Sequence, residues 1–159
     1  MTPREDNSTQ WVRGAYTITT DQALFDFEKA HDFIARQSYW GQGIPMDTLR
    51  KSAAHSLSFG MFHGAEQIGF ARVVTDRATF GYLADVFIDE AYRGQGLGKW
   101  FIATILAHPE LQGLRRWMLA TRDAHGLYAQ NGFTPLKKPE TFMERHDPEV
   151  YQKTSKKTK

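Results

Sequence analysis

The spacing of hydrophobic and polar positions changes from one segment of the chain to the next, and this order predicts the fold. Residues 16–19 alternate between polar and apolar as a short strand does. Thr19 and Gln22 then have the spacing of a capping box, and apolar residues follow at helical intervals. After an aromatic loop with two glycines and a proline, a second short helix is expected from about Asp47 to the alanines at 53 and 54.

Three longer segments with strand character follow, and short turns connect them. Residues 57–62 and 67–75 flank the sequence His-Gly-Ala-Glu, which has the usual length of a hairpin loop. Residues 79–88 form the third segment, which is rich in aromatic and branched side chains. The three segments predict an antiparallel meander.

The last part of the chain alternates again between helical and strand-like patterns. Residues 97–108 place their apolar side chains on one helical face, and a proline then ends the helix. A strand over residues 116–121 is expected next, then a helix over 124–131 closed by Gly132, and then a strand over 133–136. This order predicts an α/β (α+β) fold with a mixed, mostly antiparallel central sheet flanked by helices.

Length and composition fit one domain. The chain has 159 residues, of which 41% are hydrophobic and 13% aromatic, and its formal net charge is +2. The domain is expected to span residues 15–150, between a flexible N-terminus of residues 1–14 and a lysine-rich, flexible tail of residues 151–159. The chain has no cysteine, which excludes disulfides, thiolate metal sites and thiol nucleophiles, and we expect no metal.

The sequence predicts a cytoplasmic protein. Residues 1–10 are polar and lack the apolar stretch of a signal peptide, and no apolar run approaches the roughly 18 residues that cross a membrane. The basic tail lacks the interleaved aromatic residues of a single-strand-binding surface. We therefore expect neither a membrane nor a nucleic acid as a partner.

A turn with three glycines is the main chemical signal in the chain. Gly94, Gly96 and Gly98 stand at alternate positions, directly between a strand and a helix. Glycine permits positive φ and a close approach of the backbone to a ligand. A helix N-terminus adds unpaired N–H groups and the positive end of the helix dipole. With Arg93 and Lys99 at its rim, this turn predicts a bound anion such as a phosphate.

Two common phosphate-binding motifs do not fit this turn. A dinucleotide fingerprint would need its third glycine where Lys99 stands. A Walker loop would need Ser or Thr in place of Trp100 and a glycine in place of Arg93.

The segment Arg93-Gly94-Gln95-Gly96-Leu97-Gly98 instead matches the signature (Arg/Gln)-x-x-Gly-x-(Gly/Ala), and the chain thereby resembles the GCN5-related N-acetyltransferases. Residues 86–88 resemble the fourth strand of that family, and residues 127–133 resemble its tyrosine-bearing helix with the Gly-Phe segment that follows. The resemblance covers about residues 16–136. It implies a sheet that splays between its fourth and fifth strands, with acetyl-CoA as co-substrate and no metal.

The resemblance also implies which residues bind acetyl-CoA. Main-chain groups of the fourth strand would bind the pantetheine arm, and the glycine-rich turn would bind the pyrophosphate. Thr121 stands where many relatives have asparagine, so its expected bond to the pantetheine is less complete. The other expected contacts are Val86, Phe87, Ile88, Arg93, Gly94, Gln95, Gly96, Leu97, Gly98 and Lys99.

Three residues are candidates for proton transfer. Tyr128 would give a proton to the leaving thiolate, and the alternative is a core tyrosine on an amphipathic helix. The attacking amine needs a base, and Asp85 is the first choice because it interrupts an apolar strand. The alternative for Asp85 is a carboxylate on the solvent face or an ion pair with Arg72. His125 is the second candidate for the base, although it would equally contact the co-substrate or cap the helix, and Asp123 is expected as the N-cap.

The acceptor is the least defined part of the predicted site. Tyr39 and Trp40 lie in a loop that lines the acceptor pocket in relatives, and packing between the first two helices is the alternative. Aromatic walls suit an apolar or a cationic acceptor. Residues 39–45, 70–76 and 119–125 resemble a bacterial branch of the family whose substrates are mostly undefined.

The predicted function is transfer of an acetyl group from acetyl-CoA to a primary amine by direct attack, which makes the protein an acyl-CoA-dependent N-acyltransferase. A small-molecule amine is favoured over a protein as the acceptor. The alternatives are an acyltransferase that uses a longer acyl-CoA and a non-catalytic CoA-binding regulatory module. A homodimer is compatible with the resemblance, because dimers are common among relatives.

Overall fold

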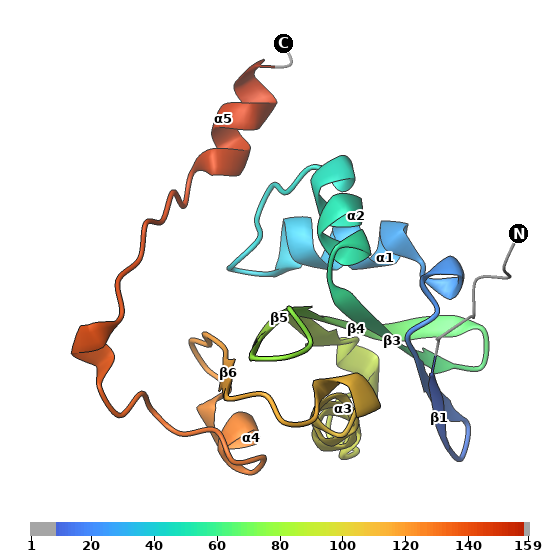
Figure 1. The fold of residues 1–159 in the computed structure, drawn as a ribbon. Coiled ribbons are helices and arrows are strands. Elements are labelled where there is room, and N and C mark those ends of the chain that lie inside the picture. The colour runs from blue at the N-terminus through green and yellow to red at the C-terminus, as the bar shows by residue number, and fades with distance from the viewer. Residues whose placement is uncertain (1–8, 158–159) are drawn as a thin grey trace, which may run out of the picture.

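The centre of the protein is a six-stranded sheet with helices on both faces, seen in a computed structural model that describes residues 9–157 (Figure 1). The strand order β1-β2-β3-β4-β5-β6 follows the chain, and every neighbouring pair is antiparallel except β5 and β6, which are parallel. The strands are β1 (Gln10–Arg13), β2 (Tyr16–Thr19), β3 (Leu57–His63), β4 (Glu66–Thr75), β5 (Phe80–Ile88) and β6 (Arg116–Met118). The mixed, mostly antiparallel sheet expected from the sequence is confirmed.

Helices α1 and α2 cover one face of the sheet, and α3 and α4 cover the other (Figure 1). The α-helices are α1 (Phe27–Asp32), α2 (Met46–Ala54), α3 (Leu97–Leu106), α4 (His125–Ala129) and α5 (Val150–Lys157). The π-helix and 3-10 helices are η1 (Gln22–Leu24), η2 (Phe33–Gln37, the π-helix), η3 (Glu90–Tyr92), η4 (Pro109–Leu111) and η5 (Pro139–Thr141). Each face has its own apolar cluster, centred on Phe59 and Phe101 beside α3 and on Phe70 and Phe87 beside α1 and α2. None of the helices in the described part of the chain is long and apolar enough to cross a membrane.

Two segments near the ends of the chain have secondary structure that the sequence did not predict. Gln10–Arg13, expected within a flexible N-terminus, pairs with β2, because the Trp11 ring packs 6.3 Å from Phe59 and 5.7 Å from His108. Val150–Lys157 forms α5, and Tyr151 packs against the cluster beside α1 and α2; the expected flexibility of the two ends stays a prediction. Residues 1–8 and 158–159 lie outside the described part.

Two features inside the chain differ from the prediction: the cap of the first helix and the last expected strand. The expected capping box at Thr19 is wrong: its hydroxyl accepts from the Asp21 N–H (3.1 Å), whereas Asp26 caps α1 by accepting from the Lys29 N–H (3.0 Å). The strand expected over residues 133–136 is absent, and this segment is a loop that contains Pro135, which has no N–H to donate.

The pairing of β5 with β6 is short. It runs from Phe80↔Arg116 to Tyr82↔Met118, and β6 ends there rather than at residue 121. β5 continues from Leu83 to Ile88 beyond its last partner in β6. The expected splay between these two strands stays a prediction, and the end of β5 is where the candidate site lies.

One buried histidine makes a pH prediction. Burial lowers the pKa of His108 below its ordinary value, and its Nδ1 accepts a hydrogen bond from the Glu110 N–H (3.1 Å). A histidine whose pKa is lower in the folded state stabilises the fold above its unfolded pKa of about 6.5, and this contribution is lost as the pH falls. We expect the melting temperature to fall more steeply from pH 7 to pH 5 in the wild type than in His108→Gln; equal slopes would contradict this.

Candidate functional site

A cavity of about 500 Å³ opens at the end of β5. Its walls come from the loop after η2, the end of β5, the glycine-rich turn and the segment that leads into α4. It brings together eleven of the predicted site residues: Tyr39, Trp40, Val86, Phe87, Ile88, Arg93, Gly94, Gly96, Leu97, Gly98 and Tyr128.

The glycine-rich turn has the conformation that an anion site requires. Gly94 and Gly96 lie in the left-handed region, with φ of 80° and 79°, and a Cβ at either would meet no atom within 4 Å. Gly96 is also the N-cap of α3, where no side chain satisfies the first N–H groups of the helix. These N–H groups and the open space beside them fit a phosphate.

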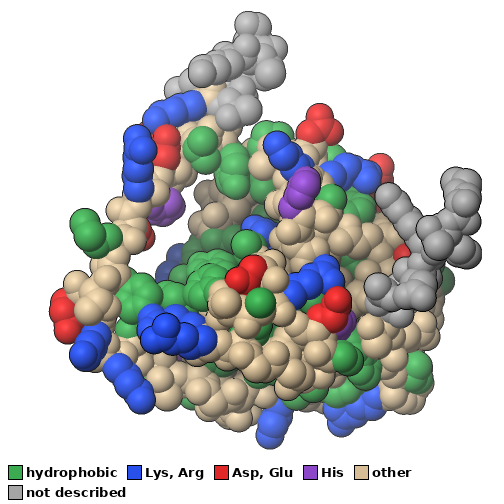
Figure 2. Space-filling model, in the orientation of Figure 1, with side chains coloured by type: hydrophobic (Ala, Val, Ile, Leu, Met, Phe, Trp, Pro, Cys, Tyr) green, Lys and Arg blue, Asp and Glu red, His purple; other side chains and the backbone are tan. Residues whose placement is uncertain are grey.

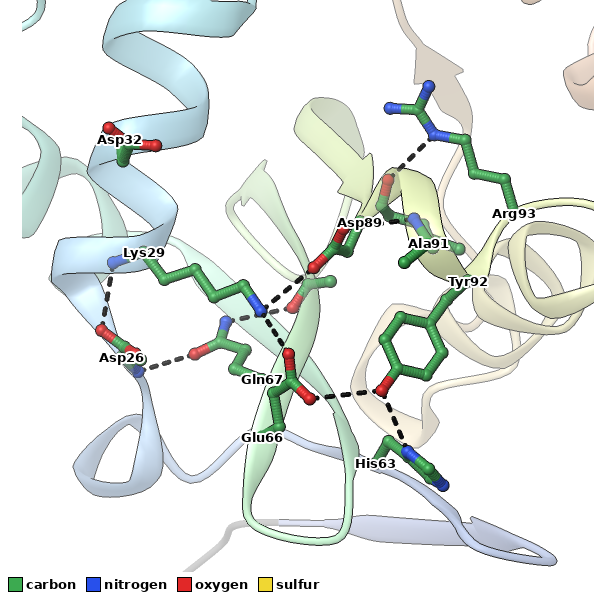
Figure 3. A network of polar contacts seen from close by, with 12 residues as sticks. Asp26, Lys29, Asp32, His63, Glu66, Gln67, Asp89, Ala91, Tyr92 and Arg93 are labelled. Atoms are coloured by element: carbon green, nitrogen blue, oxygen red, sulfur yellow. Dashed lines mark hydrogen bonds and ion pairs between the residues drawn. The ribbon is translucent and has the colours of Figure 1, made fainter.

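Polar contacts hold this turn against the rest of the fold (Figure 3). Lys29 on α1 forms ion pairs with Glu66 and Asp89, both at 3.2 Å, and the Tyr92 hydroxyl donates to Glu66 (3.2 Å) and lies 3.1 Å from His63. Burial acts to lower the pKa of Lys29, but the hydrogen bonds to the two carboxylates raise it above its ordinary value. The network therefore joins α1 and the β3–β4 hairpin to the segment that precedes the turn.

Arg93 adds a second link at the turn. Its Nε donates to the Ile88 carbonyl oxygen (3.0 Å), so the side chain connects the start of the turn to the end of β5 (Figure 3). Arg93 also lines the cavity and brings a positive charge to it.

Tyr128 is buried, and its hydroxyl opens to the cavity. The side chain is 9% exposed and its ring packs edge-on against Phe133 at 5.9 Å. Within the described residues the Tyr128 hydroxyl has no hydrogen-bond partner. Every fully buried side-chain polar atom in these residues does have a partner, so this hydroxyl is not fully buried, and the cavity is the space that Tyr128 lines. Burial, together with Tyr39 and Asp123, raises the pKa of Tyr128 to about 12, so the phenol keeps its proton at neutral pH.

Asp85 lies outside the cavity lining, and both of its carboxylate oxygens are hydrogen-bonded. Trp40 Nε1 donates to one (2.8 Å) and Arg72 Nε donates to the other (2.6 Å). The ion pair with Arg72, an alternative that the sequence left open, is present. Asp85 has a φ of 56° at a bulge where β5 has one more residue than β4, and this conformation aims the side chain at Trp40 and Arg72. The contact with Trp40 was not expected, because no local pattern indicates a positive φ at an aspartate.

Tyr39 and Trp40, in the loop after η2, line the cavity. The rings of the two residues meet edge-on at 5.0 Å. The Tyr39 hydroxyl accepts from the Arg122 N–H (2.7 Å), and the Arg122 guanidinium lies 4.0 Å from the centre of the Tyr39 ring. Arg122 is thus a site residue that sequence reasoning missed, because its partner is 83 positions away.

Besides Asp85, four more predicted residues lie outside the cavity lining. Gln95 accepts from the Tyr16 hydroxyl (3.1 Å), and Lys99 is exposed. Thr121 Oγ1 accepts from the Ala124 N–H (3.1 Å), so Thr121 holds the start of α4. His125 is the exposed first residue of α4. Their predicted roles stay predictions.

The expectation that Asp123 is the N-cap of α4 is wrong. Ala124 is the N-cap residue, and no side chain makes the capping hydrogen bond there. Asp123 lines the cavity instead. Within residues 9–157, no group of three or more His, Cys, Asp or Glu residues could hold a metal ion.

Comparison with known proteins decides the family. Residues 55–135, which include the glycine-rich turn and Tyr128, match the acetyltransferase (GNAT) domain. The chain is also 32% identical over 143 residues to a Gibberella zeae protein named as an acetyltransferase, covering 76% of this chain and 80% of that one. The chain belongs to the GNAT acetyltransferase family. The resemblance stated from the sequence is confirmed.

Two solved structures place this GNAT protein among its neighbours. A crystal structure from Xanthomonas campestris, described as a GNAT-family acetyltransferase, has a TM-score of 0.83 and 45% identity, and the match covers 86% of this chain and 96% of that one. A Clostridium acetobutylicum acetyltransferase solved with acetyl-CoA has a TM-score of 0.58 and 12% identity, and covers 88% of this chain and 95% of that one. The second shares the fold alone.

Proposed function

We propose that this GNAT protein transfers an acetyl group from acetyl-CoA to a primary amine. The observation that carries the proposal is that one cavity connects the turn at the N-terminus of α3 with the hydroxyl of Tyr128. Acetyl-CoA has a thioester at one end and a pyrophosphate towards the other. A cavity with a candidate phosphate site and a buried proton donor suits such a molecule.

The residues at the cavity fit acetyl-CoA. The turn offers open space at Gly94 and Gly96, positive charge from Arg93 and the N–H groups of α3. Residues 86–88 line the cavity, and their main-chain groups would bind the pantetheine arm. That the Clostridium acetobutylicum relative is described with acetyl-CoA supports the same donor here.

In the proposed reaction the amine nitrogen bonds to the thioester carbon, and the carbon–sulfur bond breaks. Tyr128, with a pKa raised by burial to about 12, would give its proton to the sulfur that leaves. The proton that the amine loses needs a base, and the two hydrogen-bonded oxygens of Asp85 favour a positioning role for that residue. Of the described residues that line the cavity, Asp123 is the one carboxylate, and we propose it as the base in place of Asp85 or His125.

The acceptor would enter beside Tyr39 and Trp40. Both rings are partly exposed, so they offer apolar contact to a small amine. One face of Tyr39 already carries the Arg122 guanidinium, which leaves Trp40 as the ring for a cationic acceptor.

A thiol-release screen tests the proposal. The protein is mixed with acetyl-CoA and a panel of amino acids, polyamines and peptides, and released CoA is read with a thiol reagent. The reading has no background from the protein, because the chain has no cysteine. We expect release with one amine class and slower release from longer acyl-CoA donors. Binding of acetyl-CoA without release from any amine would instead support a regulatory CoA-binding module.

A further inference from the structure

Two opposite charges stand next to each other in the chain on the wall of the cavity at the end of β5. Arg122 and Asp123 both line this cavity, in the segment that leads from β6 to α4. Of the other described residues that line it, only Arg93 is charged at neutral pH, and Arg93 belongs to the glycine-rich turn. Arg122 and Asp123 are therefore the charged groups of the cavity outside the proposed phosphate site.

Neither of these two side chains has an ionic partner in the described part of the chain. The Asp123 carboxylate makes no hydrogen bond or ion pair there, and the Arg122 guanidinium contacts only the Tyr39 ring. Surface charges of this protein do pair where their positions allow it, as Arg36 does with Asp32, and Figure 2 shows Lys and Arg side chains interspersed with Asp and Glu side chains on one face. Two unpaired, opposite charges on one cavity wall suit a ligand that carries both charges itself.

Arg122 is held in a position that leaves its N–H groups free. Its guanidinium lies over the Tyr39 ring, 4.0 Å from the ring centre, and its backbone N–H donates to the Tyr39 hydroxyl (2.7 Å). A guanidinium held over an aromatic ring keeps its N–H donors available, and two of them match the two oxygens of a carboxylate. Because Tyr39 already orders this side chain, Arg122 loses less conformational entropy when it binds an anion.

Asp123 lies near the reacting end of the same wall. Burial is the main cause of the raised pKa of Tyr128, and Tyr39 and Asp123 add to it, so both lie close to the hydroxyl that would protonate the leaving thiolate. An ammonium group beside Asp123 would be bound by its charge and, in the proposed reaction, would give it a proton. The carboxylate of the same molecule would then lie towards Arg122.

The neutral side chains of this wall mainly offer apolar contact. Trp40 Nε1 donates to Asp85 (2.8 Å), so the indole N–H is already used. The Ser38 hydroxyl donates to the Ile34 carbonyl oxygen (2.6 Å). The Trp40 and Phe33 rings, whose centres are 6.3 Å apart, therefore present aromatic surface to the cavity, which suits an apolar side chain.

We propose that the acceptor is an amino acid with a free carboxylate, which Arg122 binds while Asp123 holds the amino group. This assignment rests on the proposed acetyl transfer and adds the class of acceptor to it. The phosphates of CoA are the competing anions for Arg122, so the experiment has to separate the acceptor from the co-substrate.

Matched pairs of acceptors test this assignment. Each L-amino acid of a panel is compared with its amide, which keeps the amino group and the side chain but loses the carboxylate charge, and CoA release gives kcat/KM for both. With the wild type we expect at least one amino acid to be used about tenfold better than its amide. In Arg122→Gln this preference should fall to within about twofold through a higher KM for the amino acid, while the Kd for acetyl-CoA by calorimetry changes by less than about twofold.

Arg50→Gln is the matched control for this variant. The Arg50 guanidinium lies over the Phe27 ring, 4.8 Å from its centre and outside the cavity lining, so its loss should leave the preference unchanged. A preference that Arg122→Gln leaves intact would overturn the proposal, and a raised Kd for acetyl-CoA in the same variant would assign Arg122 to a CoA phosphate instead.

The same panel separates this acceptor from the transfer reaction itself. Amides or polyamines acetylated as well as amino acids would overturn the amino acid as acceptor and leave the acetyl transfer standing. No acetylation of any amine would reject the proposed function, and the acceptor with it.

Discussion

Replacing Tyr128 with phenylalanine is expected to lower kcat about 100-fold and to leave the Kd for acetyl-CoA within about twofold. The phenyl ring keeps the packing against Phe133, so the cavity wall is retained, while the hydroxyl that opens to the cavity is lost. Thiol release measures kcat, and titration calorimetry measures Kd. Because burial raises the pKa of Tyr128 to about 12, ionisation of this residue should not lower wild-type activity up to pH 10.

Tyr82→Phe is the control for this substitution. Tyr82 lies on β5, outside the cavity lining, and its loss of a hydroxyl should leave kcat unchanged. An unchanged kcat in Tyr128→Phe would reject the proton-donor role and leave Tyr128 as a core residue.

Replacing Gly96 with alanine is expected to raise the Kd for acetyl-CoA at least about tenfold. The substitution places a Cβ at a φ of 79°, which costs about 1–2 kcal/mol for an L-residue, and puts that atom into the open space where the phosphate would lie. Titration calorimetry with acetyl-CoA measures the change.

Gly113→Ala separates backbone strain from ligand contact. Gly113 has a φ of 77° and equally open surroundings, but it does not line the cavity. Both variants should therefore lose a similar amount of thermal stability, and only Gly96→Ala should weaken binding. An equal effect of the two on Kd would contradict a phosphate site at this turn.

The sequence predicted the features that depend on local order. Alternating residues predicted the meander, and glycines at alternate positions predicted the turn that leads into α3. Gly132 also has the left-handed φ, 88°, expected at the end of α4. Each of these follows from residues that are close in the chain.

Contacts between distant segments could not be predicted in the same way. The bond between Tyr39 and Arg122 joins two loops, and the position of Asp85 between Trp40 and Arg72 depends on a bulge that has no sequence pattern. The position of β1 depends on Trp11, because the Trp11 ring contacts Phe59 and His108 only in the folded chain. The network around Tyr92 was missed for the same reason.

The central claim is that the cavity at the end of β5 transfers an acetyl group to an amine. Mass spectrometry of the amine after incubation with acetyl-CoA carrying a ¹³C-labelled acetyl group tests it most directly. The account predicts labelled N-acetyl amine in equal amount to released CoA with the wild type, and a rate about 100-fold lower with Tyr128→Phe. Released CoA with labelled acetate and no labelled amine, across all amine classes, would contradict it.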